Sequence, residues 1–180
     1  MPVNSWDEAC AEALKEIFEY SKTVRINDPF GFTELDAVSQ ALAEFVRRPH
    51  EADIFQAAAL MRQAAACALH IMHEQGHLPT REGMQTLLCR KQHDYGHGNI
   101  DNFGLVGVAV RLCDKIARAK NIKKRGAATV KNETMIDTYE DIVGYASIAV
   151  MLRDGTFMLD LDPDETAKRK YSTTESENTK

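Results

Sequence analysis

The chain has 180 residues, of which 44% are hydrophobic and 27% charged, a composition typical of one globular domain. Its formal net charge of −5 gives no reason to expect strong nucleic-acid binding, which needs a basic surface. The N-terminal stretch MPVNSWDEAC has neither a basic start nor an apolar core, so we expect no signal peptide.

Two further features indicate a cytoplasmic protein without a membrane span. The longest stretch with few charges, around 57–72, is interrupted by Arg62, Gln63 and His70, which predicts a buried helix. The four cysteines form no CxxC pair, and each stands in a helical stretch. This usage is typical of reduced thiols packed as small hydrophobic side chains.

The first half of the chain has helical periodicity. Ser5 and Glu8 have the spacing of a capping box, and a helix over about 6–21 follows them. A second helix is expected after a cap at Thr33, ending near residue 49. The third, over about 51–73, is very apolar, and we expect it to be the central core helix.

The second half predicts three more helices. The first begins after Thr80 and ends at Lys91, where the polar, glycine-punctuated run KQHDYGHGNID predicts a loop. Two long helices, about 103–122 and 133–153, follow with a basic linker between them. We therefore expect an all-α bundle of about five or six helices: one domain over 1–160, with its motifs in 88–153, and a disordered tail over 161–180.

The last predicted helix carries an acidic ridge. Glu133, Asp137 and Asp141 recur every fourth residue and so share one face, where their like charges repel. The ridge continues into Gly144 and Ile148 instead of the long polar side chains of an ordinary solvated face.

The preceding helix carries complementary groups. Opposite its apolar stripe lie Gly107, Arg111, Asp114 and Arg118. Carboxylates suit Mg²⁺, arginines suit phosphate, and helical glycines leave room for close approach, so the facing pair predicts a nucleotide phosphate site. The alternative is that both acidic faces are merely solvated, with Asp114 and Arg118 as a surface pair.

A second motif, at residues 73–77, is only a weak indication of a zinc site. His73-Glu74-Gln75-Gly76-His77 matches the zinc-protease pattern HExxH. Zinc binding needs both imidazoles on one uninterrupted helix, but Gly76 and Pro79 predict that the helix ends before His77. His93 and His97 have the same spacing, but we expect them in a loop and not as a metal pair.

Several segments occur in an order that resembles the nucleotide-modification-associated domain found in many phage genomes. The resemblance covers about 88–151 and rests on Lys91-Asp94-Tyr95-Gly96, Phe103-Gly104, Arg111-Asp114-Lys115-Arg118, Glu133-Asp137-Thr138-Asp141 and Tyr145-Ala146. For a phage-encoded protein the expected location is the host cytoplasm.

That family is similar in turn to the all-α nucleoside triphosphate pyrophosphohydrolases of the MazG and dimeric dUTPase group. Those enzymes hold Mg²⁺ with ExxE on one helix and ExxD on the next, and they convert (d)NTP to (d)NMP and pyrophosphate. This chain departs from the pattern, since position 111 is Arg and the second helix has Glu133, Asp137 and Asp141 at steps of four. The resemblance also implies a homo-oligomer.

Three hypotheses follow. In the first, the protein is a Mg²⁺- or Mn²⁺-dependent (d)NTP pyrophosphohydrolase; in the second, a non-catalytic nucleotide-binding accessory protein of DNA modification; in the third, a structural helical protein with interhelical salt bridges. In the first hypothesis, the metal is held by Asp114, Glu133, Asp137 and Asp141. The charge that develops on the phosphates is stabilised by Arg111, Lys115 and Arg118. The base or sugar is contacted by Lys91, Asp94, Tyr95 and Asn99.

Overall fold

The computed structural model describes residues 2–26, 32–50, 53–126 and 134–163. These ranges contain helices and no strand, which confirms the predicted all-α fold. Six of the helices are long, and α5 has only four residues. The helices are α1 (Trp6–Ser21), α2 (Phe32–Arg47), α3 (Ile54–Glu74), α4 (Arg81–Tyr95), α5 (Gly98–Asp101), α6 (Gly104–Arg125) and α7 (Met135–Arg153).

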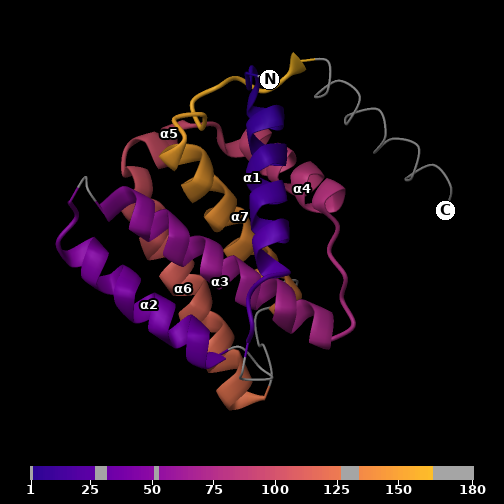
Figure 1. The fold of residues 1–180 in the computed structure, drawn as a ribbon, viewed down its shortest axis with the longest axis vertical. Helices are drawn as coiled ribbons and strands as arrows, with labels where there is room; N and C mark the ends of the chain where they lie inside the picture. The colour runs from indigo at the N-terminus through magenta and orange to yellow at the C-terminus, as the bar shows by residue number, and fades with distance from the viewer. Residues whose placement is uncertain (1, 27–31, 51–52, 127–133, 164–180) are drawn as a thin grey trace, which may run out of the picture.

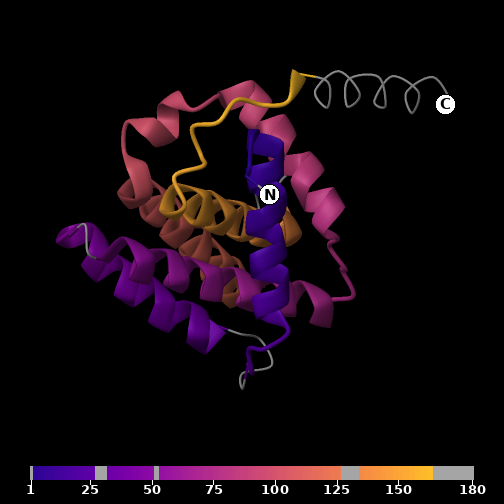
Figure 2. The same ribbon diagram turned by 45° about the horizontal axis from the view of Figure 1, so that its top comes forward.

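Helices α2, α3, α6 and α7 form a bundle, and α1 lies across it (Figure 1). The most extensive contact joins α3 to α7, followed by that between α6 and α7. Helix α1 packs against α3 and α7 on one side and against α4 on the other, as the turned view in Figure 2 also shows. This arrangement brings α4, α6 and α7 together although α4 is distant from α7 in the sequence.

The helix starts follow from side-chain caps. Ser5 Oγ accepts a hydrogen bond from the Glu8 amide at 3.3 Å, and Thr80 Oγ1 accepts one from the Gly83 amide at 3.0 Å. Both starts agree with the sequence prediction. Helix α2 begins at Phe32, one residue before the predicted cap at Thr33.

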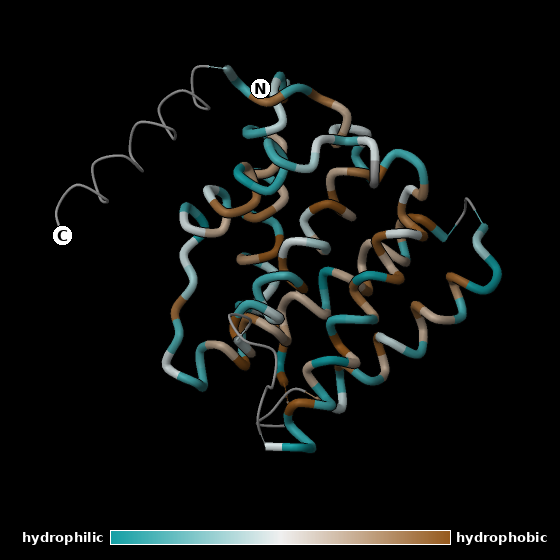
Figure 3. Tube along the Cα trace, turned by 180° about the vertical axis from the view of Figure 1, so that it is seen from behind, coloured by the Kyte–Doolittle hydropathy of each residue, from teal (hydrophilic) through white to brown (hydrophobic). Residues whose placement is uncertain are grey.

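The predicted core is confirmed. Apolar residues recur about once per turn along the helices in Figure 3, and every long helix contributes buried apolar side chains to the core. Helix α3 is long and apolar enough to cross a membrane by length and composition, but just over half of that stretch is buried against the other helices. All four cysteines are unpaired, and burial raises the pKa of the Cys67 thiol to about 12, as expected of a packed, unreactive side chain.

The predicted loop after Lys91 is wrong. Helix α4 continues through Tyr95 and ends at Gly96, whose φ of +62° suits glycine. The run KQHDY contains no helix breaker, and Gln92 within it is buried. Its polarity therefore reflects one exposed helix face and not an irregular segment. The consequence is that Lys91 and Tyr95 lie one turn apart on the same helix.

The segment after α7 returns to the start of α1. The Trp6 amide donates to the Asp160 carbonyl at 2.8 Å, and the Asp162 amide donates to Asp7 Oδ2 at 2.8 Å. Phe157 is buried with its ring edge-on to Trp6. Most of the predicted tail falls on 164–180, outside the described residues.

Candidate functional site

A pocket of about 310 Å³ lies where α4, α6 and α7 meet beside the start of α1. Each of the three helices contributes a pair of side chains spaced one turn apart. Helix α4 provides Lys91 and Tyr95, α6 provides Arg111 and Lys115, and α7 provides Asp141 and Tyr145. The remaining lining residues are Trp6, Leu88, Gln92, Gly96, Ile100, Gly144 and Ile148.

Asp141 connects the three helices at the wall of this pocket. Its Oδ2 lies 2.7 Å from Lys115 Nζ on α6, and its Oδ1 accepts a hydrogen bond from Lys91 Nζ on α4. The Asp141 side chain is 18% exposed, against 23% for Lys115 and 41% for Lys91. Charge-assisted hydrogen bonds of this kind are stronger than neutral ones, and partial burial limits their screening by salt.

Asp141 is held as an anion. Burial opposes its ionisation, but the hydrogen bonds and positive charges of Lys115 and Lys91 outweigh that effect, so the pKa of Asp141 lies below its ordinary value. The carboxylate in turn holds two ammonium groups from separate helices at one point of the pocket wall. With Arg111, the described lining residues include three cationic side chains and one anionic side chain.

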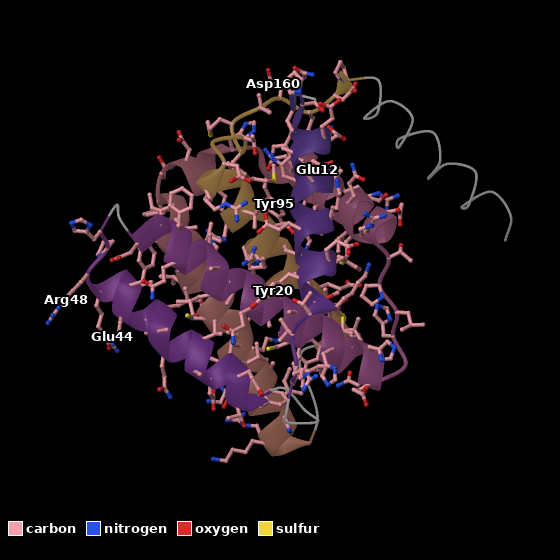
Figure 4. All side chains as sticks on the ribbon, in the orientation of Figure 1. Glu12, Tyr20, Glu44, Arg48, Tyr95 and Asp160 are labelled. Carbon is pink, nitrogen blue, oxygen red and sulfur yellow. The ribbon has the colours of Figure 1, made fainter. Side chains whose placement is uncertain are left out.

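Aromatic side chains complete the pocket. Tyr95, labelled in Figure 4, is 75% exposed at its rim, while Tyr145 is half-buried. Trp6 is buried, and its Nε1–H has no hydrogen-bond partner among the described residues. Buried polar groups usually have a partner, so this N–H is a donor available to an acceptor.

Three of the four predicted metal ligands are described, and these three form no metal-binding group. Asp114 is exposed on α6. Asp137 forms a capping box, because its Oδ2 accepts a hydrogen bond from the Thr134 amide and its own amide donates to Thr134 Oγ1 at 3.1 Å. Glu133 lies outside the described residues. Across the described part of the chain, no group of three or more His, Cys, Asp or Glu side chains could hold a metal ion.

The predicted substrate contacts divide into two groups. Lys91, Tyr95, Arg111 and Lys115 line the pocket. Arg118 instead donates to Thr138 Oγ1 and so joins α6 to α7 one turn away from the pocket.

Of the other two predicted contacts, Asp94 is described and does not line the pocket. The Asp94 side chain is 74% exposed and lies 3.1 Å from His93 Nδ1. The side chain of Asn99 lies outside what the structure describes.

The two helical glycines make room for protein side chains. A Cβ at Gly144 would lie 2.8 Å from Leu88 Cδ2, so this glycine permits close contact between α4 and α7. A Cβ at Gly107 would lie 2.5 Å from the Cβ of Phe103, at the start of the same helix. We predicted that both glycines make room for a ligand, but both make room for neighbouring side chains of the protein. Gly144 also lines the pocket.

The HExxH match is not a metal site in the described structure. Helix α3 ends at Glu74, and Gly76 follows with a φ of +76°. His77 therefore leaves the helix, and its Nε2 lies 3.4 Å from Glu140 Oε1. This confirms that the helix ends before the second histidine.

Sequence reasoning missed Trp6 and Gln92 as pocket residues. Gln92 adjoins Lys91, and a helical reading of KQHDY would have placed it on an inward face. Trp6, the single tryptophan of the chain, is 85 residues before Lys91 and reaches the pocket only through the packing of α1 against α4 and α7. No local signal indicates that contact.

A second hollow, of about 370 Å³, lies beside α1 and the end of α7. It is larger, but its charged lining is mainly acidic, from Glu12, Glu16, Glu19 and Asp154 with Lys15. It contains none of the predicted site residues, so we place the candidate site in the pocket between α4, α6 and α7.

The fold and site define an all-α protein with a pocket that is rich in cationic and aromatic side chains. Residues 91–152 match the family described as "Nucleotide modification associated domain 1". The matched segment, about a third of the chain, runs from Lys91 almost to the end of α7 and so includes all four charged residues among the described pocket lining. Searches of curated proteins and of solved structures found no match.

Proposed function

We propose that the protein binds a nucleotide in the pocket between α4, α6 and α7, as part of nucleotide modification. The observation that carries the proposal is the placement of Lys91 and Lys115 on one carboxylate at the wall of a pocket, within the segment that matches the family. A phosphate group can replace or join that carboxylate as the acceptor for both ammonium groups.

The other lining residues suit the rest of a nucleotide. Arg111 lies one turn before Lys115 on the pocket-facing side of α6 and offers a second type of phosphate contact. Tyr95 and Tyr145 offer ring faces for a base or a sugar. A purely structural role is less well supported, because a structural ion pair would not need an adjoining cavity.

The binding proposal is tested by titrating nucleotides into the wild-type protein and into Lys115→Met. Methionine keeps much of the length of the side chain but removes the ammonium group. We expect wild-type binding to weaken about tenfold or more in Lys115→Met, as for a lost charge-assisted contact.

Lys124→Met is the matched control, since Lys124 is exposed near the end of the same helix and does not line the pocket. Its affinity should equal that of the wild type. No binding of any common (d)NTP, (d)NDP or (d)NMP, or equal losses in the two variants, would contradict the proposal.

Hydrolysis of (d)NTP to (d)NMP and pyrophosphate is the second candidate, favoured by the ionised Asp141 in the pocket and by the sequence resemblance. The described residues do not fit the Mg²⁺ ion that this activity implies. Both Asp141 oxygens bind ammonium groups, and Asp137 caps α7. We therefore rank nucleotide binding without hydrolysis first.

A pyrophosphate-release assay separates the two candidates. A panel of (d)NTPs is incubated at high enzyme concentration with Mg²⁺ or Mn²⁺. Binding without product supports the first proposal. Turnover that disappears in Asp137→Asn would instead support the hydrolase, because asparagine retains an oxygen for the cap but loses the charge a metal needs.

A further inference from the structure

We infer that the side-chain amide of Gln92 binds the edge of the nucleobase and so determines which base the pocket accepts. The inference rests on the proposed function and adds to it the residue that selects the base. Gln92 lines the pocket from α4 and is only 7% exposed. Its amide has no hydrogen-bond partner among the described residues. Buried polar groups usually have a partner, so this amide is a donor and an acceptor that a ligand can use.

A second glutamine on α4 shows what a structural amide does in this fold. Gln85 Nε2 donates to the Asp7 carbonyl at 3.0 Å and so joins α4 to α1, and Gln85 does not line the pocket. Gln92 lies two turns later and is more buried, yet its amide makes no such contact with the described residues. Leaving a buried amide unpaired costs stability, so packing alone does not explain a glutamine at this position.

The neighbours of Gln92 on α4 suit the flat faces of a base. Leu88 lies one turn before Gln92 and Tyr95 nearly one turn after it, so the three form one line along the pocket wall. Leu88 provides an apolar surface and Tyr95 a ring face. A base that lies against these two side chains presents its edge to the amide between them.

The proposed phosphate contacts adjoin this line. Lys91 immediately precedes Gln92 and binds Asp141, which in turn binds Lys115. A phosphate at these two ammonium groups leaves the base to the adjoining part of the wall, where Gln92 and Tyr95 lie. Neighbouring positions of α4 therefore divide the nucleotide between a phosphate contact and a base contact.

The chemistry of an amide matches a base better than it matches a phosphate. The Gln92 side chain carries a donor and an acceptor side by side, whereas phosphate oxygens only accept. Bases present donors and acceptors along their edges, and glutamine can bind two of them at once. A base of the wrong pattern leaves the buried amide unpaired, which is how a hydrogen-bonding site rejects a ligand.

Calorimetric titration of the wild type and of Gln92→Met tests the inference. The ligands are the mono- and triphosphates of each common deoxynucleoside, with deoxyribose phosphate and inorganic triphosphate as ligands without a base. Methionine keeps much of the length of the side chain and removes the amide. We expect the preferred nucleotide to bind about tenfold more weakly, the affinities for different bases to become more alike, and the affinity for ligands without a base to stay unchanged.

Gln85→Met is the matched control on the same helix. It should lower the Tm, because it removes a hydrogen bond between α1 and α4, and it should leave the nucleotide affinities unchanged. Gln92→Met should keep or raise the Tm, because it removes an unpaired buried amide. Gln92→Leu, a second apolar replacement, should behave in the same way.

Three results would overturn the inference and leave nucleotide binding intact. The first is an equal loss of affinity for nucleotides and for ligands without a base, and the second is an unchanged preference among the bases. The third is a fall in Tm for both Gln92 variants as large as that of Gln85→Met, which would make Gln92 a structural residue. Absence of binding of every nucleotide to the wild type overturns the proposed function itself.

Discussion

Asp141 binds two ammonium groups that come from different helices, and this makes it the central residue of the site. Removing one partner of a partly buried charge pair costs more than removing an exposed one, because the remaining charges stay desolvated. The same carboxylate keeps both lysine side chains directed at one place in the pocket. At this scale, the contacts that stabilise the fold are the same contacts that the proposed function assigns to ligand recognition.

Asp141→Asn should lower the free energy of unfolding by about 2 kcal/mol at neutral pH, the range for hydrogen bonds to charged groups. The pKa of Asp141 is depressed in the folded protein, so its contribution is present above the unfolded value of about 3.9 and is lost as pH falls through the lower folded value. The stability difference between wild type and variant should therefore shrink below about pH 4.

Denaturant unfolding at several pH values measures this difference. Glu44→Gln removes an exposed acid paired with Arg47 and should change stability by no more than about 0.5 kcal/mol at any pH. A difference for Asp141→Asn that stays constant from neutral to acid pH would contradict the assigned role.

At the scale of elements, the sequence predicts most of the helices because their caps and apolar periodicity are local signals. Ser5, Thr80 and the apolar stripes of α6 and α7 are examples. The extension of α4 to Tyr95 was missed because a polar helix face and a polar loop have similar composition. The sequence predicts that Arg111, Lys115 and Asp141 lie on the facing sides of two neighbouring helices. It does not predict that Asp137 caps α7, because that role depends on where the helix begins.

The capping box of α7 gives a prediction for this scale. Thr134→Ala and Asp137→Ala should each cost about 1 kcal/mol of stability. The double variant should cost less than the sum, because either change alone breaks the reciprocal bonds of the box.

Chemical denaturation of the single and double variants measures the coupling. Ser5→Ala, which removes the cap of α1, is the comparison, and its combination with Asp137→Ala should be additive because the two caps are independent. Full additivity of Thr134→Ala and Asp137→Ala would show that Asp137 does not act in the cap.

At the scale of the whole molecule, contacts between distant segments determine the pocket. Trp6 reaches it through the packing of α1, and the segment around Phe157 covers Trp6. A charged cluster on another part of α1 holds the helices together: Arg153 Nη1 and Nη2 donate to Glu16 at 2.9 and 2.7 Å, and Arg62 from α3 pairs with the same carboxylate. Sequence alone shows none of these pairings, because they depend on tertiary packing.

Arg153→Lys should cost about 1–2 kcal/mol of stability, because lysine cannot form the bidentate contact with Glu16. The hydrogen bond and charge of Arg153 hold the pKa of Glu16 below its usual value, against the opposing effect of burial. Thermal unfolding compares this variant with Arg47→Lys, at an exposed pair on α2 that should change stability by no more than about 0.5 kcal/mol. Equal effects of the two substitutions would contradict a joining role for Arg153.

The central claim is that a nucleotide phosphate binds at Lys91 and Lys115, and a crystal structure of the protein with its best-bound nucleotide tests it most directly. We predict phosphate oxygens at about 2.7–2.9 Å from both ammonium nitrogens, with the base or sugar against Tyr95 or Tyr145. A nucleotide bound elsewhere, for example in the hollow beside α1, or this pocket left empty at saturating nucleotide, would contradict the claim.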